Sequence, residues 1–313
     1  MIGYIYTILK SNNPGVSVFQ VLILLFIIYV LYLIIIKYKK KERTREGFTQ
    51  NERFVYKKNN KIYDNFYSQI YDEIHIPEQR VGYELMNIIK ITQPSSQNSV
   101  FLDVGSGTGH LVNELKEAGY TAYGLDKSKS MIEHSEEKFP KCQYKCGDAK
   151  EPMLFEKGVF THIISTYFTL YQMKDKRTFL QNCHNWLMPN GYLIIHLVDK
   201  QKFDTLVPAS RMNAEINPHK YASSRLINSK IEFPGFDYKS IYKFNKDNIV
   251  NHIETFKDNK TNNIRQNEQT LYMEEIEEIL EMLSTIGFTF KGMFDMKKSV
   301  DDEFQYVYIL EKI

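Results

Sequence analysis

Residues 100–111 read VFLDVGSGTGHL, and this stretch decides the fold of the chain. Its first five residues are a short apolar run typical of a buried strand, and a helical pattern follows at residues 110–118. Between the two, Gly105, Gly107 and Gly109 let backbone N–H groups approach a ligand where a Cβ atom would clash. The stretch therefore predicts a strand, a ligand-binding loop and a helix.

The spacing of the loop bears on which ligand it binds. Glycine-rich loops also form ordinary turns, and dinucleotide-binding enzymes use a related loop. Here the spacing is G-x-G-x-G instead of the dinucleotide pattern G-x-G-x-x-G. Asp103 ends the preceding strand, and its carboxylate attracts a positively charged ligand and repels a pyrophosphate. The loop therefore favours a ligand that carries positive charge.

Two more carboxylates end the following strands. Asp126 can accept hydrogen bonds from both hydroxyls of a ribose, and Asp148 can accept one from the exocyclic amine of a base. Either residue alone can instead cap a helix, and Asp126 does precede a predicted helix start. Three strand-end carboxylates in succession, with the glycine loop first, favour a ligand site.

The rest of the chain alternates helices and strands, which predicts a parallel sheet with helices on both faces. We expect helices at residues 64–74, 78–91, 110–118, 130–138 and 174–187, and strands at 100–104, 121–125, 143–146, 162–166 and 192–198. Half-exposed antiparallel strands follow at 238–245, 249–257 and 264–272. A helix at 274–286, with Gly287 as its C-cap, precedes a hairpin of residues 288–295 and 304–310.

These motifs resemble the class I S-adenosylmethionine-dependent methyltransferases of the small-molecule type, from about residue 63 to the C-terminus. VFLDVGSGTGHL is similar to the first motif of that family, YGLDKSKSMIEHS to the second and CGDA to the third. THIISTYFTLYQ resembles the fourth strand with its acceptor-facing loop, and LMPNGYLIIHLVD resembles the fifth strand with its turn. The resemblance implies a Rossmann-like α/β fold with a seven-stranded sheet and an antiparallel β insertion, about residues 200–272, before the last two strands.

The resemblance also implies an enzyme that uses S-adenosyl-L-methionine to methylate a small-molecule or lipid-like acceptor. Asp103 would lie near the methionine amino group, and Asp126 would bind the ribose. The remaining expected cofactor contacts are the loop residues Gly105, Ser106, Gly107 and Gly109, the adenine contacts Asp148, Ala149 and Met131, and the closing aromatic Tyr67 of segment 63–71.

Displacement at a sulfonium methyl group needs alignment and exclusion of water more than it needs a catalytic triad. A base is required only if the acceptor loses a proton. Candidates at or beyond the fourth and fifth strand ends are His196, Tyr167, Tyr171 and Asp199, and no base is assigned because His196 alternates with apolar residues as a structural histidine would. Aromatic residues of the insertion suit an apolar or flat acceptor or form a small core of their own: Phe233, Phe236, Tyr238 and Tyr242.

The charge of the chain is distributed unevenly. Its 313 residues carry a net charge of +2, but residues 1–46 hold seven basic and two acidic groups, which leaves 33 basic and 36 acidic groups in the remainder. A body with a net charge of −3 argues against nucleic-acid binding. Three cysteines, Cys142, Cys146 and Cys183, are too few for a disulfide framework, and their spacing does not predict a metal site.

An uncharged apolar run covers residues 16–36 and is followed by four lysines within five residues. At 1.5 Å per residue the run reaches roughly 30 Å, the thickness of a bilayer core. It is too long for a signal peptide and lacks the polar stripe of a globular helix. We expect a short outer tail (1–15), a single transmembrane helix (16–36), a basic linker (37–61) and a cytosolic methyltransferase domain (62–313).

Two other classes of function remain open at this stage. An NAD(P)-dependent oxidoreductase of the Rossmann type is one, since Tyr242-x-x-x-Lys246 matches a dehydrogenase pair, although it falls in a predicted strand instead of a helix. A membrane-tethered scaffold without catalysis is the other. The glycine loop and Asp126 together favour the methyltransferase.

Overall fold

The computed structural model describes residues 22–33, 52–211, 218 and 221–313 of the chain. By their contacts the residues divide into two compact units, Met1–Thr49 and Gln50–Ile313. The membrane span expected over residues 16–36 lies partly outside the described residues, which leave out 16–21 and 34–36. Its described part, residues 22–33, is a helix with every residue exposed. Among the described helices, none is both long enough and apolar enough to cross a membrane.

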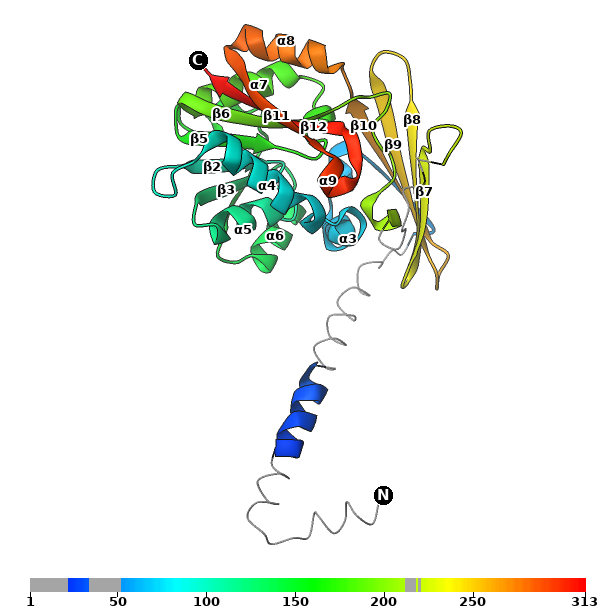
Figure 1. Cartoon of the computed structure of the whole chain (residues 1–313). Helices are drawn as coiled ribbons and strands as arrows, with labels where there is room; N and C mark the ends of the chain where they lie inside the picture. The colour runs from blue at the N-terminus through cyan, green and yellow to red at the C-terminus, as the bar shows by residue number, and fades with distance from the viewer. Residues whose placement is uncertain (1–21, 34–51, 212–217, 219–220) are drawn as a thin grey trace, which may run out of the picture. The chain divides into compact units, whose positions relative to one another are not determined.

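The second unit is built on a mixed sheet of seven strands, in the order β11-β12-β6-β5-β2-β3-β4 (Figure 1). Strands β6, β5, β2, β3 and β4 pair in parallel, and β12 is antiparallel to both β6 and β11. This arrangement confirms the expected Rossmann-like sheet with a reversed last strand. The strands are β2 (Val100–Val104), β3 (Thr121–Asp126), β4 (Gln143–Cys146), β5 (Phe160–Ser165), β6 (Leu187–Val198), β11 (Phe288–Met296) and β12 (Asp302–Lys312).

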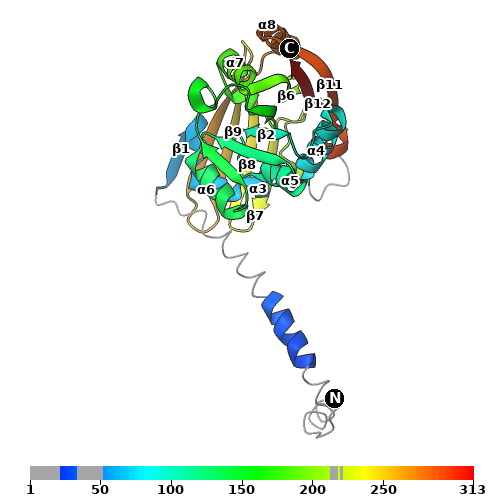
Figure 2. The same ribbon diagram turned by 90° about the vertical axis from the view of Figure 1, so that its left-hand side faces the viewer.

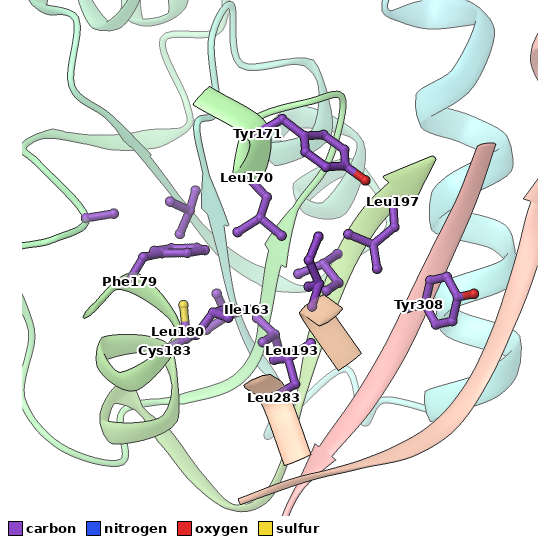
Figure 3. Close-up of a cluster of buried hydrophobic side chains, with 14 of the residues drawn as sticks. Ile163, Leu170, Tyr171, Phe179, Leu180, Cys183, Leu193, Leu197, Leu283 and Tyr308 are labelled. Atoms are coloured by element: carbon purple, nitrogen blue, oxygen red, sulfur yellow. The ribbon is translucent and has the colours of Figure 1, made fainter. Parts of the chain in front are cut away.

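Helices cover both faces of this sheet because its strands are apolar on both sides. Helices α7 (Lys176–Trp186) and α8 (Ile276–Ile286) pack on one face. Figure 3 shows part of this core, where Phe179 and Leu283 approach the sheet from the two helices. Helices α4 (Glu78–Thr92) and α5 (His110–Glu117) pack on the other face. Helix α8 ends at Gly287 with φ +111°, which confirms the expected C-cap.

Four strands of the insertion and strand β1, from near the start of this unit, form a second sheet in the order β1-β10-β9-β8-β7. Figures 1 and 2 show it beside the seven-stranded sheet. Its strands β7 to β10 alternate buried and exposed residues, as half-covered antiparallel strands do. The five strands are β1 (Phe54–Lys58), β7 (Asn228–Phe233), β8 (Phe236–Phe244), β9 (Ile249–Asp258) and β10 (Ile264–Tyr272).

Strands β1 and β7 were not predicted from the sequence. Strand β1 lies inside the expected linker 37–61 and pairs in parallel with β10, with Phe54 opposite Ile264. The linker assignment therefore needs correction over residues 54–58. The physical reason is that β1 contains two lysines and has no core of its own, so its pairing depends on a strand more than 200 residues away.

Helix α3 (Asn65–His75) joins the two sheets. Asp64 caps its first turn by accepting the N–H of Tyr67. Arg265 of β10 is 4% exposed and holds this helix start: its guanidinium donates to the Asp64 carboxylate and the Ile62 carbonyl, and it stacks on the ring of Phe66. The remaining short elements are α6 (Lys129–Lys138), α9 (Lys297–Val300), η1 (Asn59–Ile62), η2 (Pro152–Leu154), η3 (Leu170–Gln172) and η4 (Pro208–Arg211).

Replacing Arg265 by alanine should lower the free energy of unfolding by about 2 kcal/mol, because the half-buried Asp64 carboxylate and the Ile62 carbonyl lose their donor. Chemical denaturation of the full chain measures this change. The exposed Lys239→Ala variant of β8 is the control and should change stability by less than about 0.5 kcal/mol. Equal stabilities of the two variants would contradict the role given to Arg265.

Candidate active site

A cavity of about 340 Å³ lies at the carboxyl ends of β2, β3 and β4; we refer to it as the first cavity. Parallel strands place their carboxyl ends at one edge, and there the chain turns into loops that can surround a ligand. Most residues expected from the sequence line this cavity, and Gly109 and Tyr67 do not. Those in the lining are Asp103, Gly105, Ser106, Gly107, Asp126, Met131, Asp148 and Ala149.

Asp103 brings a buried carboxylate to the wall of the first cavity. The residue is 5% exposed, and within the described chain no side chain or backbone group donates a hydrogen bond to it. Burial raises the pKa of Asp103 to about 7, although the nearby Arg80 guanidinium acts in the opposite direction. A carboxylate in this position would be stabilised by a cationic ligand.

Asp126 is held by the backbone on both sides. Its Oδ2 accepts the N–H of Gly107 at 3.0 Å, and its Oδ1 accepts the N–H of Ser128 at 2.8 Å. Burial raises the pKa of Asp126 despite these donors. The capping alternative does not hold for this residue, because Ser128 is the N-cap of α6. Each Asp126 oxygen keeps a lone pair that can accept a ligand hydroxyl.

Asp148 follows β4 and is paired at the surface. Its Oδ2 accepts from the Lys127 ammonium at 2.7 Å, and its Oδ1 accepts the N–H of Lys150. Burial by itself would raise the pKa of Asp148, but these donors lower it below the usual range. Asp148 is therefore a charged acceptor at physiological pH.

The glycines of the loop have two different roles. A Cβ atom on Gly105 would lie 2.5 Å from Thr169, so the loop needs a glycine there to stay against the cavity wall. Gly109 has φ +83°, is the N-cap of α5, and has the Tyr144 hydroxyl and Ser135 where a side chain would start. Gly109 therefore permits packing of the loop and is not part of the cavity lining.

Two buried polar atoms in the wall of the first cavity have no partner within the described residues: Arg80 Nε and Ser106 Oγ. Arg80 pairs through its Nη1 with the buried Glu84 carboxylate at 3.2 Å, which fixes the guanidinium at the cavity. These atoms can serve a ligand that brings its own acceptors. The sequence did not predict Arg80 as a site residue. Its position at the cavity depends on how α4 packs, and the residues of that helix, 78–92, carry no local signal for this packing.

Tyr67 lies in α3 and does not line the first cavity. It is 3% exposed, and its hydroxyl contacts His75 and Glu254. Tyr63 and Tyr71, from the same aromatic segment 63–71, do line the first cavity. The segment was thus recognised from its aromatic residues, but the pattern did not indicate which rings face the ligand.

A second cavity of about 380 Å³ shares Arg80 and Tyr167 with the first. Its lining combines aromatic and apolar side chains with a larger number of polar and charged ones. The apolar and aromatic part comprises Phe168, Leu206, Val207, Tyr242 and Met296, and the polar part includes His75, Glu84, His196 and Gln305. Two adjoining cavities can hold two ligands side by side.

The four candidate bases lie in different places. Tyr167 lines both cavities, and burial raises the pKa of its hydroxyl to about 12. His196 lines the second cavity, where burial lowers its pKa to about 3 and Gln305 holds its Nε2 at 3.0 Å. Tyr171 is fully buried with its hydroxyl accepting the N–H of Val198, and Asp199 pairs with Lys202. Neither of the last two lines a cavity described above.

Residues 102–195 match the family described as methyltransferase domain. No curated protein matches the chain. Among solved structures, an S-adenosylmethionine-dependent methyltransferase from Clostridium acetobutylicum is similar, with 17% identity, a TM-score of 0.59 and coverage of 79% of this chain and 98% of that one. The CcbJ methyltransferase from Streptomyces caelestis has 15% identity, a TM-score of 0.60 and coverage of 80% and 97%.

A third similar structure is CalS10 from Micromonospora echinaspora, an amino pentose methyltransferase with S-adenosylmethionine bound. It has 15% identity, a TM-score of 0.52 and coverage of 74% of this chain and 89% of that one. At these identities the likeness concerns the fold, and the family match over residues 102–195 identifies the domain. The chain thus contains a methyltransferase domain, the domain of an enzyme, and its fold is that of the S-adenosylmethionine-dependent methyltransferases named above.

Proposed function

We propose that the first cavity binds S-adenosylmethionine along the row of strand-end carboxylates. Asp103 binds the methionine ammonium group, Asp126 binds the ribose hydroxyls, and Asp148 with Ala149 meets the adenine, whose face packs on Met131. The unpartnered Nε of Arg80 suits the methionine carboxylate. The cofactor supplies an electrophilic methyl group on a sulfonium sulfur.

The observation that carries this assignment is the Asp103 carboxylate, which is buried at the cavity wall and lacks a hydrogen-bond donor among the described residues. A buried carboxylate is costly without a partner, and an ammonium group supplies one. A dinucleotide would instead bring its pyrophosphate to this loop, next to Asp103. Tyr63 and Tyr71, in place of Tyr67, are suited to closing over the cofactor.

Cofactor affinity should depend on pH through Asp103. Its pKa is about 7, so the carboxylate is ionised above that value and protonated below it. The affinity for S-adenosylmethionine should therefore be highest between about pH 7 and 8, where the carboxylate is ionised and the cofactor ammonium group keeps its proton, and fall about tenfold for each pH unit well below 7. Isothermal calorimetry of the full chain measures this dependence.

The Asp103→Asn variant is the matched control, because it keeps the shape of the side chain and removes the charge. At pH 8 it should bind about 30-fold more weakly, and most of the pH dependence should be lost. If the chain bound NADH more tightly than S-adenosylmethionine, the oxidoreductase alternative would be favoured. If it bound no adenosyl ligand at all, the alternative of a scaffold without catalysis would be favoured.

We propose that the methyl acceptor binds in the second cavity. The support is its position, since it shares Arg80 and Tyr167 with the first cavity, and its lining, in which rings and apolar side chains stand beside polar and charged groups that can orient a ligand. Such a lining suits a small molecule with an apolar or flat part, including a lipid-like one. A full chain incubated with methyl-labelled cofactor and a cell extract shows whether label enters lipid, protein or small metabolites.

A larger side chain in the second cavity should block methyl transfer to the acceptor without changing the affinity for the cofactor. In Leu206→Trp the larger side chain occupies acceptor space, so label incorporation should fall at least about tenfold. Cofactor affinity by calorimetry should stay within threefold of the original protein. The exposed Lys239→Trp variant controls for the added ring. Unchanged incorporation in Leu206→Trp would place the acceptor elsewhere.

We also propose that residues 16–36 anchor the enzyme in a membrane as a single-pass segment with the catalytic unit in the cytosol. The support is the apolar sequence, the lysines that follow it, and the exposure of every residue of the helix at 22–33. Exposed apolar side chains along a whole helix are stabilised by a lipid or protein environment. An anchor would bring the enzyme close to lipid-like acceptors.

The double variant Leu25→Lys, Ile28→Lys should release the full chain from membranes, because charges at the centre of a span oppose insertion. Fractionation after alkaline washing measures this, and Leu25→Ala, Ile28→Ala is the control that should stay bound. Release of the original protein by the same wash would refute the anchor. In microsomal translation, the sequon Asn259-Lys260-Thr261 should remain unglycosylated, and a glycan there would reverse the orientation.

A further inference from the structure

A chain of buried hydrogen bonds leads from Tyr167 into the five-stranded sheet. The Tyr167 hydroxyl lies 3.0 Å from Nδ1 of His75, and Nε2 of His75 lies 3.0 Å from the Tyr67 hydroxyl. Tyr67 donates in turn to Oε1 of Glu254 at 2.9 Å. We name these four residues the relay. It begins at the wall shared by the two cavities and ends on strand β9.

The donors and acceptors of the relay fix its direction. Tyr67 has one hydroxyl proton, and it is donated to the Glu254 carboxylate, so the Tyr67 oxygen must accept from His75 Nε2–H. The neutral imidazole then carries no proton on Nδ1, and Tyr167 must donate its own proton there. Every hydrogen bond in the relay therefore points from the cavities toward Glu254.

Glu254 is the buried acceptor at which the relay ends. Its side chain is 2% exposed, and its described partners are neutral donors: the hydroxyls of Tyr67 and Tyr238 on Oε1, and the Asn267 amide on Oε2 at 3.4 Å. Neutral donors stabilise a buried carboxylate less than an ammonium or guanidinium group in contact would.

His75 can transmit a proton but not retain it. Burial, with further contributions from His252 and Arg80, lowers its pKa to about 3, so the imidazole is neutral at any working pH. The titratable groups around it are Tyr67, Tyr71, Tyr167, Arg80, His252 and Asp72. A proton that reaches Nδ1 is therefore passed on through Nε2.

Tyr167 is held in a strained position at the shared wall. Its φ is +50° and that of Phe168 is +65°, a left-handed conformation that costs energy for aromatic residues. The Arg80 guanidinium lies 4.2 Å from the centre of its ring. This positive charge favours transient negative charge on the phenol oxygen. Strain of this kind persists where surrounding contacts hold it, and here it aims the hydroxyl at His75.

We propose that Tyr167 is the catalytic residue that takes the proton from the methyl acceptor, and that His75, Tyr67 and Glu254 are positioning residues that carry the charge away. The acceptor forms its bond to the methyl carbon and the methyl–sulfur pair stays on sulfur, while the acceptor proton moves to the Tyr167 oxygen. The Tyr167 proton moves to Nδ1, the Nε2 proton to Tyr67, and the Tyr67 proton to Glu254. The positive charge of the sulfonium and the negative charge of Glu254 are both removed.

This proposal rests on the proposed acceptor site, but one test needs neither acceptor nor cofactor. Nitrogen NMR of the full chain labelled at histidine, with the His75 signals assigned by their loss in His75→Gln, reports the tautomer. We expect a proton on Nε2 and an unprotonated, hydrogen-bonded Nδ1. In Tyr167→Phe the Nδ1 signal should shift toward that of a free imidazole nitrogen. A proton on Nδ1 would overturn the relay, because this nitrogen could then not accept the proton of Tyr167.

Kinetics with labelled cofactor and the extract provide the second test. Tyr167→Phe should reduce the maximal rate of incorporation about 100-fold, and Glu254→Gln about 10-fold, with cofactor affinity within threefold. Tyr56→Phe, which removes a phenol donor to the Glu268 carboxylate away from both cavities and the relay, is the control and should change the rate less than threefold. A normal rate in Tyr167→Phe would refute the relay alone, whereas no incorporation by the original protein would refute the proposed function.

Discussion

The parallel pairing of β5, β2, β3 and β4 is the constraint on which the site depends. Because these strands run in the same direction, their carboxyl ends meet at one edge of the sheet, and so do Asp103, Asp126 and Asp148. Each carboxylate has a different environment. Asp103 has no donor among the described residues, Asp126 is held by two backbone N–H groups, and Asp148 is paired with Lys127. One strand direction thus produces three acceptors suited to three parts of one ligand.

Helix α3 connects this edge to the insertion. On one side its Asp72 accepts from Thr108 and His110 and pairs with Lys138, so the helix is fixed to the glycine loop, α5 and α6. Burial alone would raise the pKa of Asp72, but these partners lower it below the usual range. On the other side Tyr67 reaches Glu254. Helix α3 is therefore held both by the elements around the glycine loop and by the five-stranded sheet.

Much of the fold could be predicted because its signals are local. The apolar run before Asp103 and the spacing of the glycines predict a strand, a loop and a helix start within a dozen residues. The alternation at β8 to β10 is equally local. Strand β1 was missed because its partner β10 lies more than 200 residues away.

The sequence predicted those residues of the candidate site that follow from local patterns, and not those that depend on contacts between distant residues. Strand ends place Asp126 and Asp148 correctly in the cavity lining, but the sequence does not show that Gly109 packs against Tyr144 or that Tyr67 turns away from the cavity. Contacts between distant residues decide such details: Tyr67 and Glu254 are 187 residues apart, and His75 and Tyr167 are 92 apart. Local patterns carry no information about these pairs.

A crystal structure of the chain with S-adenosylhomocysteine tests the central assignment most directly. The account predicts the ligand in the first cavity, with its ribose hydroxyls on Asp126, its adenine between Met131 and Asp148, and its amino group within hydrogen-bond distance of Asp103. A ligand whose ribose or amino group lies away from these carboxylates would contradict it.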